Sequence, residues 1–115
     1  MKPQQLLVLA ATVANRRPSH ARAYQLAAFA ERRDGLLVSA FNVQVPTQRT
    51  PRGHAEYRIH SKLTVGSVVA VARLSSLGEW AFAKPCKACE TLLRNCRVKK
   101  VFYTIGPKEY GVLEL

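Results

Sequence analysis

Two short motifs place the tightest limit on how this chain can fold, because their side chains are expected to meet at one metal ion. The first is His54-Ala55-Glu56, and the second is Pro85-Cys86-Lys87-Ala88-Cys89. Zinc binds imidazole and thiolate ligands tetrahedrally, and three protein ligands leave a fourth position open to water. Bound zinc lowers the pKa of that water towards about 7. We therefore expect His54, Cys86 and Cys89 to hold Zn²⁺, with Glu56 carrying protons beside it.

Each motif alone has other interpretations. A C-x-x-C pair also occurs in structural zinc knuckles and in redox pairs. A redox pair would not need His54 and Glu56, and a structural knuckle would usually need a fourth protein ligand. A helix after Cys89 would place Cys96 about 10 Å further along its axis, which favours a small buried apolar residue there. A basic zinc module that binds nucleic acid without catalysis remains an alternative.

The length and composition are typical of a compact intracellular enzyme. The 115 residues predict one domain, residues 1–115, and 48% of them are hydrophobic. Three cysteines, two of them assigned to zinc, do not make a disulfide framework, so we expect a cytoplasmic protein. No stretch approaches the roughly 20 apolar residues that span a membrane, so we expect no membrane partner.

The charge of the chain favours anionic partners. Eighteen Lys and Arg residues against seven Asp and Glu residues give a formal net charge of +11. Nucleotide phosphates and the backbone of single-stranded nucleic acid both fit this charge, although a basic surface without a dedicated partner is the alternative. The bases expected to matter most flank the two motifs and are Arg49, Arg52, Lys84 and Lys87.

Hydrophobic periodicity and turn residues predict a helix, a hairpin and then alternating helices and strands. The stretch Ala21–Arg33 is ambiguous, because its alanines favour helix. The turn signal Asp34-Gly35 favours a hairpin instead, which would make Tyr24–Glu31 a strand. A polar loop is expected over Gln44–Gly53. The other expected elements are helices over Gln4–Arg16, His54–Leu63 and Cys86–Asn95, and strands over Leu36–Phe41, Val68–Leu74, Val101–Ile105 and Tyr110–Leu115.

This order of elements predicts an α/β fold. Both motifs begin a helix, so their ligands should project from two helix N-termini, and Pro85 fits a first-turn position. The Gly106–Glu109 link is too short for a parallel crossover, so the last two strands should be antiparallel. We expect a three-layer sandwich in which helices cover both faces of a mixed five-stranded sheet.

The pattern H-x-E…P-C-x-x-C resembles the cytidine deaminase superfamily over nearly the whole chain. The residues that carry the resemblance are His54-Ala55-Glu56, Ala83–Cys89 and Lys99–Thr104; the last two segments also look like small deaminase-like proteins of phage and bacterial genomes. The resemblance implies hydrolysis at C4 of cytosine, with Glu56 protonating N3 and then the departing amine. It also implies that backbone groups near Ala55 and Pro85 hold the base edge, and that Phe41, with Phe82 or Trp80, lines the pocket.

The substrate is expected from two further resemblances. Phe41-Asn42-Val43-Gln44 resembles the N-V-E-N segment of free cytidine deaminases, which makes Asn42 a candidate sugar ligand, although Gln44 replaces the family's glutamate. The antiparallel final pair also resembles those enzymes. We therefore expect a free (deoxy)cytidine or its nucleotide as substrate, with single-stranded DNA or RNA as the alternative that the charge favours. Relatives commonly form homo-oligomers, so a dimer or tetramer is expected.

Overall fold

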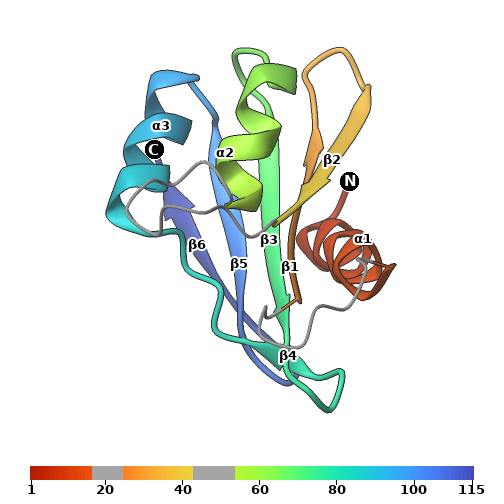
Figure 1. Ribbon diagram of the computed structural model, residues 1–115. Helices are drawn as coiled ribbons and strands as arrows, with labels where there is room; N and C mark the ends of the chain where they lie inside the picture. The colour runs from red at the N-terminus through yellow and green to blue at the C-terminus, as the bar shows by residue number, and fades with distance from the viewer. Residues whose placement is uncertain (17–24, 43–53) are drawn as a thin grey trace.

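The computed structural model describes residues 1–16, 25–42 and 54–115. Three helices and six strands follow one another along these residues (Figure 1). Among them, no helix is long and apolar enough to cross a membrane. The elements are α1 (Pro3–Arg16), β1 (Gln25–Glu31), β2 (Leu37–Phe41), α2 (Ala55–Ile59), β3 (Val68–Leu74), β4 (Trp80–Ala81), α3 (Lys87–Asn95), β5 (Lys100–Gly106) and β6 (Glu109–Glu114).

The sheet is mixed, as the sequence predicts. Its main path has the order β2-β1-β3-β5-β6, in which only β3 and β5 pair in parallel. The two-residue strand β4, which the sequence reading did not anticipate, pairs with the end of β3. β5 and β6 are antiparallel, which confirms the expectation from their short link. In that link Lys108 adopts φ 61°, a left-handed conformation common at the third position of a type II turn.

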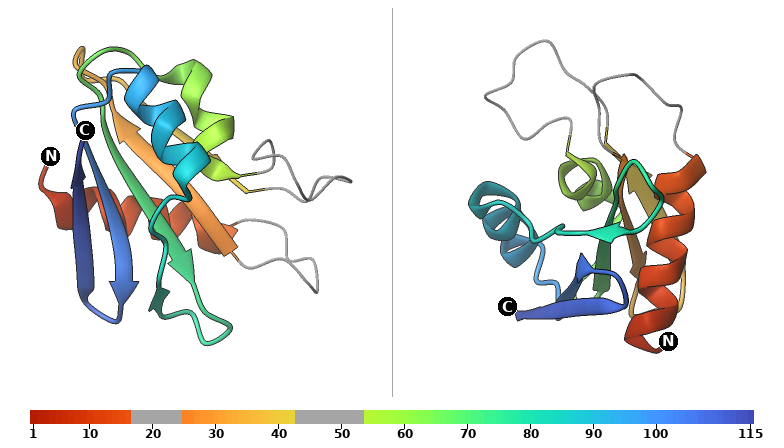
Figure 2. Two further views of the ribbon diagram at one scale, coloured as in Figure 1. Left: turned by 90° about the vertical axis from the view of Figure 1, so that its left-hand side faces the viewer. Right: turned by 90° about the horizontal axis from the view of Figure 1, so that it is seen from below.

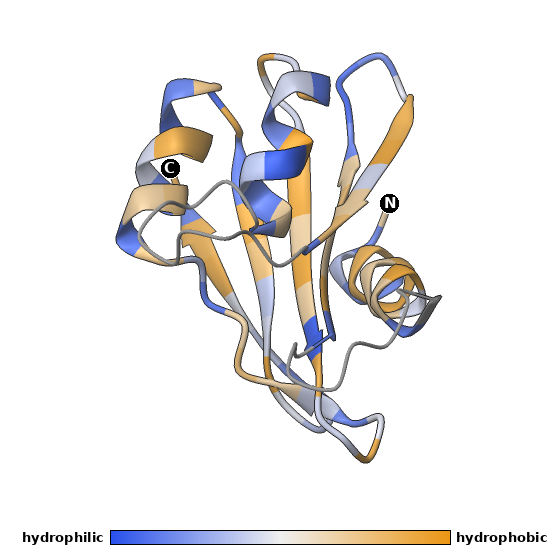
Figure 3. Ribbon diagram, in the orientation of Figure 1, coloured by the Kyte–Doolittle hydropathy of each residue, from blue (hydrophilic) through white to orange (hydrophobic). Residues whose placement is uncertain are grey.

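Helices cover both faces of the sheet, so the predicted three-layer sandwich is confirmed (Figure 2). Successive side chains of a strand point to opposite faces. In β3, Val69 and Val71 therefore face the side of α2 and α3, whereas Ala70 and Ala72 face α1. Apolar residues run along β3 in the middle of the sheet (Figure 3). One apolar cluster therefore fills the face of α2 and α3, and two clusters make up the core on the face of α1.

The strand β1 forms despite its alanines because it lies between two partners. Pairing with β2 on one side and β3 on the other satisfies its backbone hydrogen-bonding groups. Ala27, Ala28 and Ala30 are fully buried, and their small side chains let the helices on both faces pack close to the strand. Here tertiary pairing outweighs the helix propensity of alanine.

Two expected boundaries need correction. The helix expected over His54–Leu63 is shorter, because α2 ends at Ile59 and a 3₁₀ turn over His60–Lys62 follows. Pro85 does not lie in the first turn of α3, because Cys86 is the N-cap residue and Pro85 precedes it. The loop expected over Gln44–Gly53 lies outside the described residues.

Candidate metal and catalytic site

The topology brings both motifs to one end of the sheet. α3 connects the parallel strands β3 and β5, so it runs opposite to them and its N-terminus lies near the end of β3. α2 leads into β3 and also runs opposite to it, so its N-terminus lies near the same end (Figure 1). α2 and α3 contact each other on this face. Residues that begin the two helices therefore become neighbours.

His54 and Cys86 are the N-cap residues of α2 and α3. Both have extended backbone conformations, and neither side chain caps its own helix, which leaves both free to face a shared ligand. Cys89 follows in the first turn of α3, where residues three apart share a face. The Nδ1 atom of His54 lies 3.3 Å from the sulfur of Cys89 and 3.7 Å from the sulfur of Cys86.

The three side chains form a group that could hold a metal ion. Their ligand atoms all lie within 4.8 Å of one another. Zn–N and Zn–S bonds of roughly 2.0 and 2.3 Å at tetrahedral angles separate ligand atoms by about 3.5 Å, which matches the two distances from His54. Cys96 is half-buried at the end of α3 and lies outside this group, as expected. The donor set of one imidazole and two thiols suits zinc.

Glu56 is the second residue of α2 and lies two residues after His54. Its side chain is 4% exposed, and its Oε1 atom accepts no hydrogen bond from any residue that the structure describes. Burial raises the pKa of this carboxyl to about 7, while its own backbone N–H acts in the opposite direction. A buried polar atom without a partner is costly, and such atoms are typical of functional positions. The carboxyl can therefore exchange a proton near neutral pH.

Cys89 is fully buried, in contrast to Cys86, which is exposed. Burial raises the pKa of the Cys89 thiol well above its usual range, and the nearby charges of Glu56 and Cys86 act in the same direction. A hydrogen bond from the Tyr57 backbone opposes this shift. Without a cation the thiol is therefore protonated, so a metal ion that binds here must displace its proton.

Ala55 and Pro85 lie next to His54 and Cys86 of the metal group, whereas Asn42 lies at the end of β2. Ala55 is buried as the first residue of α2, and Pro85 is buried immediately before Cys86. Asn42 is 9% exposed and follows the last residue of β2. Its Oδ1 atom accepts a hydrogen bond of 3.1 Å from the backbone N–H of Leu26, and its own N–H donates to the Leu26 carbonyl.

The Phe41 ring is not brought to the metal ligands. It packs against the cluster of Ala14, Ala27 and Leu74 on the α1 face, whereas the ligands lie on the other face. Arg58 of α2 reaches Phe41 instead: its Nη1 atom donates to the Phe41 carbonyl at 2.6 Å, and its guanidinium lies 5.0 Å from the ring centroid. This contact, which fixes the end of β2 just before Asn42, was missed because no local pattern connects Arg58 to Phe41.

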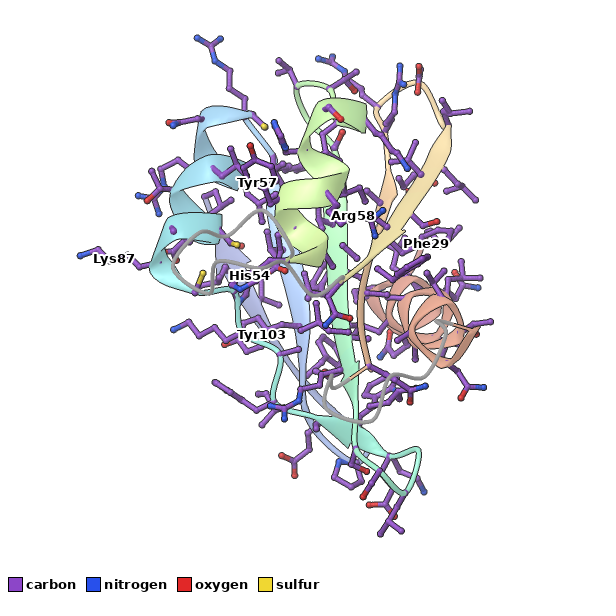
Figure 4. The ribbon with its side chains drawn as sticks, in the orientation of Figure 1. Phe29, His54, Tyr57, Arg58, Lys87 and Tyr103 are labelled. Carbon is purple, nitrogen blue, oxygen red and sulfur yellow. The ribbon has the colours of Figure 1, made fainter. Side chains whose placement is uncertain are left out.

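The basic residues expected near the site are partly described. Lys84 and Lys87 are exposed on either side of Cys86, and Lys87 points away from α3 (Figure 4). Arg49, Arg52 and Gln44 lie outside the described residues.

Comparison with known proteins identifies the fold. No family model and no curated protein matches the chain. A cytidine deaminase from Burkholderia pseudomallei has a similar structure, with a TM-score of 0.72, 16% identity, and coverage of 99% of this chain and 93% of that chain. A cytidine deaminase from Mycobacterium leprae has a TM-score of 0.63 and 18% identity, with coverage of 97% of this chain and 93% of that chain. A cytidine deaminase from Mycobacterium tuberculosis has a TM-score of 0.59 and 18% identity, with coverage of 93% of this chain and 89% of that chain. The chain therefore has the cytidine deaminase fold, as its motifs predict, and a His/Cys/Cys group that could hold a metal ion.

Proposed function

We propose that the protein is a zinc-dependent hydrolytic deaminase that converts cytosine to uracil in a free (deoxy)cytidine or its nucleotide and releases ammonia. The observation that carries this proposal is the pairing of a three-ligand group with a buried carboxyl oxygen that lacks a partner among the described residues. A structural zinc site has no use for such a carboxyl, whereas a hydrolytic site needs a group that moves protons.

His54, Cys86 and Cys89 would hold the metal, and a bound Zn²⁺ would supply Lewis-acid activation of water at neutral pH. The residues fit this role because their separations suit a tetrahedral ion with one position left for water.

Glu56 would move the protons of the reaction. Water adds at C4 of the ring, and the carboxyl passes a proton from that water to N3. It then passes a second proton to the exocyclic amine, so that the C4–N4 bond breaks and ammonia leaves. Burial of Glu56 excludes bulk water from these transfers.

The substrate assignment is supported by the fold neighbours, which are cytidine deaminases, and by the antiparallel final hairpin. Backbone groups near Ala55 and Pro85 would hold the base edge, and Asn42 would hold the sugar. Phe41 would act indirectly, because Arg58 fixes the segment that carries Asn42. The exposure of Cys86 leaves the site open on one side, which fits a cytoplasmic homodimer or homotetramer that completes it.

The test is deamination of cytidine, deoxycytidine and their monophosphates by zinc-loaded protein, followed by mass spectrometry. Glu56→Gln should lower turnover by a factor of about 10² to 10⁴ or more and should retain stoichiometric zinc. Cys86→Ser and Cys89→Ser should lose zinc, whereas Cys96→Ser is the matched control that keeps it. Single-stranded DNA and RNA oligomers are tested in parallel, and conversion of the oligomers alone would make the protein a nucleic-acid deaminase. Zinc binding without conversion of any monomer or oligomer would instead favour a basic zinc module that binds nucleic acid.

A further inference from the structure

An exposed aromatic side chain lies on the segment that leads into the metal site. Phe82 is 56% exposed, although it is a large apolar residue that is usually buried. Its ring meets the ring of Tyr103 edge to face, with centroids 6.2 Å apart and planes at 81°. Phe82 and Tyr103 together are called the aromatic edge below.

Tyr103 belongs to the same face of the sheet as the metal ligands. It lies on β5 and packs half-buried against the core that also contains Ala55 and Ala83 (Figure 4). On β6 its cross-strand partner is Gly111, and a Cβ atom there would lie 2.5 Å from the Tyr103 ring. The glycine therefore makes room for the ring to lie across β6, which fixes one half of the aromatic edge.

A backbone hydrogen bond ties the segment that carries Phe82 to the sheet. The N–H of Ala83, the next residue, donates to the Thr104 carbonyl at 2.9 Å, which ties this segment to β5. The chain then passes through Lys84 and Pro85 to Cys86. Four residues of extended chain span at most about 13 Å, so Phe82 lies within reach of the nucleotides that flank a base held at the metal.

Two lysines lie close to Phe82 in the sequence. Lys84 and Lys87 are exposed, and none of the ion pairs between described residues includes either of them. Two acidic side chains, Glu79 and Glu90, lie on the same stretch of chain. The chain as a whole carries +11. Exposed aromatic rings combined with exposed cations bind single-stranded nucleic acid, through stacking of bases and contacts to phosphates.

We propose that the aromatic edge, together with Lys84 and Lys87, binds the nucleotide next to the target cytosine, so that the site accepts single-stranded nucleic acid in addition to a free (deoxy)cytidine. This assignment rests on the deaminase function proposed above and extends its substrate class. Phe82 supplies the stacking surface, Tyr103 supports it from behind, and the two lysines contact the flanking phosphates.

The binding test uses zinc-loaded Glu56→Gln protein and labelled single-stranded oligomers, DNA and RNA, that carry one central cytosine. Phe82→Ala should weaken binding about ten-fold, whereas Phe82→Trp should retain it. An oligomer with an abasic site beside the cytosine should bind the protein that retains Phe82 about as weakly as the intact oligomer binds Phe82→Ala. With the abasic oligomer, Phe82→Ala should cause no further loss of affinity, since the base that stacks on Phe82 is already absent.

Two matched controls separate this effect from general surface changes. Leu77→Ala removes another exposed apolar residue, 84% exposed in the turn before β4, and should leave oligomer binding unchanged. Lys87→Ala should lower the slope of log affinity against log salt by about 0.7, whereas Lys108→Ala, in the β5–β6 turn, should not.

Three outcomes would overturn the inference. Equal oligomer affinity for wild type and Phe82→Ala, in a protein that deaminates cytidine, would reject the aromatic edge but keep the proposed function. A change of oligomeric state in Phe82→Ala without a change in oligomer affinity would show Phe82 to be a contact between copies of the chain. No conversion of cytidine or oligomer by the wild-type protein would reject the proposed function and the substrate class with it.

Discussion

At the scale of single residues, Glu56 defines the site more sharply than the three candidate metal ligands do. The ligands could serve a structural ion, but a buried carboxyl with an unpartnered oxygen destabilises the protein unless something binds there. The cost is largest when the carboxyl is charged, because burial raises its pKa from 4.5 to about 7. In the metal-free protein, this cost should therefore appear as a lower free energy of unfolding at higher pH.

In metal-free protein we expect Glu56→Gln to change the pH dependence of stability. A raised carboxyl pKa means that the folded state binds the proton more tightly than the unfolded state, so Glu56 weakens folding as pH rises from about 4.5 to about 7. One pKa unit corresponds to about 1.36 kcal/mol. Glu56→Gln should therefore raise the free energy of unfolding by up to about 3 kcal/mol at about pH 8 and by little at about pH 4.5. Urea unfolding in chelator at both pH values measures this. If Glu56→Gln changed the free energy of unfolding equally at both pH values, the raised pKa of Glu56 would not be the cause.

The residues at the site could largely be predicted from sequence because they are close together along the chain. His54 with Glu56, and Cys86 with Cys89, occur in two short motifs whose spacing reflects helix geometry. Arg58 and Phe41 could not be paired this way. Their contact joins a helix to a strand across a sequence separation of 17 residues, and only the packing of α2 against β2 creates it.

At the scale of elements, the β5–β6 hairpin shows how a glycine can position an aromatic ring. Gly111 faces the ring of Tyr103, and a Cβ atom at that position would lie 2.5 to 2.8 Å from two ring atoms and the hydroxyl oxygen. Gly106 lies beside the turn of the same hairpin, and a Cβ atom there would meet nothing within 4 Å. Gly106 is therefore a suitable control position for a substitution at Gly111.

We predict that Gly111→Ala destabilises the fold by about 1 to 3 kcal/mol, since the ring must move or the strands must separate. Gly106→Ala should change stability by less than about 0.5 kcal/mol. Denaturant unfolding of both variants measures the difference, and near-ultraviolet circular dichroism reports the displacement of Tyr103. Equal stability of the two variants would show that the ring adapts at no cost.

At the scale of the whole molecule, the sheet separates two cores with different roles. The core on the α2 and α3 face supports the metal ligands, whereas the core on the α1 face contains Leu6 and Leu7, both fully buried. Because the sheet lies between them, damage on the α1 face should lower stability without altering the ligand geometry.

Leu6→Ala should therefore destabilise the protein by about 2 to 5 kcal/mol, because it leaves a cavity under α1. Val8→Ala, on the same helix at a position 54% exposed, is the control and should cost less than about 0.5 kcal/mol. Urea unfolding gives both values, and zinc titration of the folded Leu6→Ala protein should match wild type. Weaker zinc binding in that variant would show that the two cores are coupled.

The sequence by itself determined the local features: the candidate ligands and carboxyl of the site, the turn at Asp34-Gly35, and the antiparallel final strands. Each depends on spacing or turn chemistry within a few residues, which local physics specifies. The tertiary structure decided that the alanine-rich β1 is a strand, that Phe41 faces α1, and that Phe82 stays exposed beside the site. These outcomes depend on which distant segments share a sheet edge or a core, and pairing and burial between such segments outweigh local propensity.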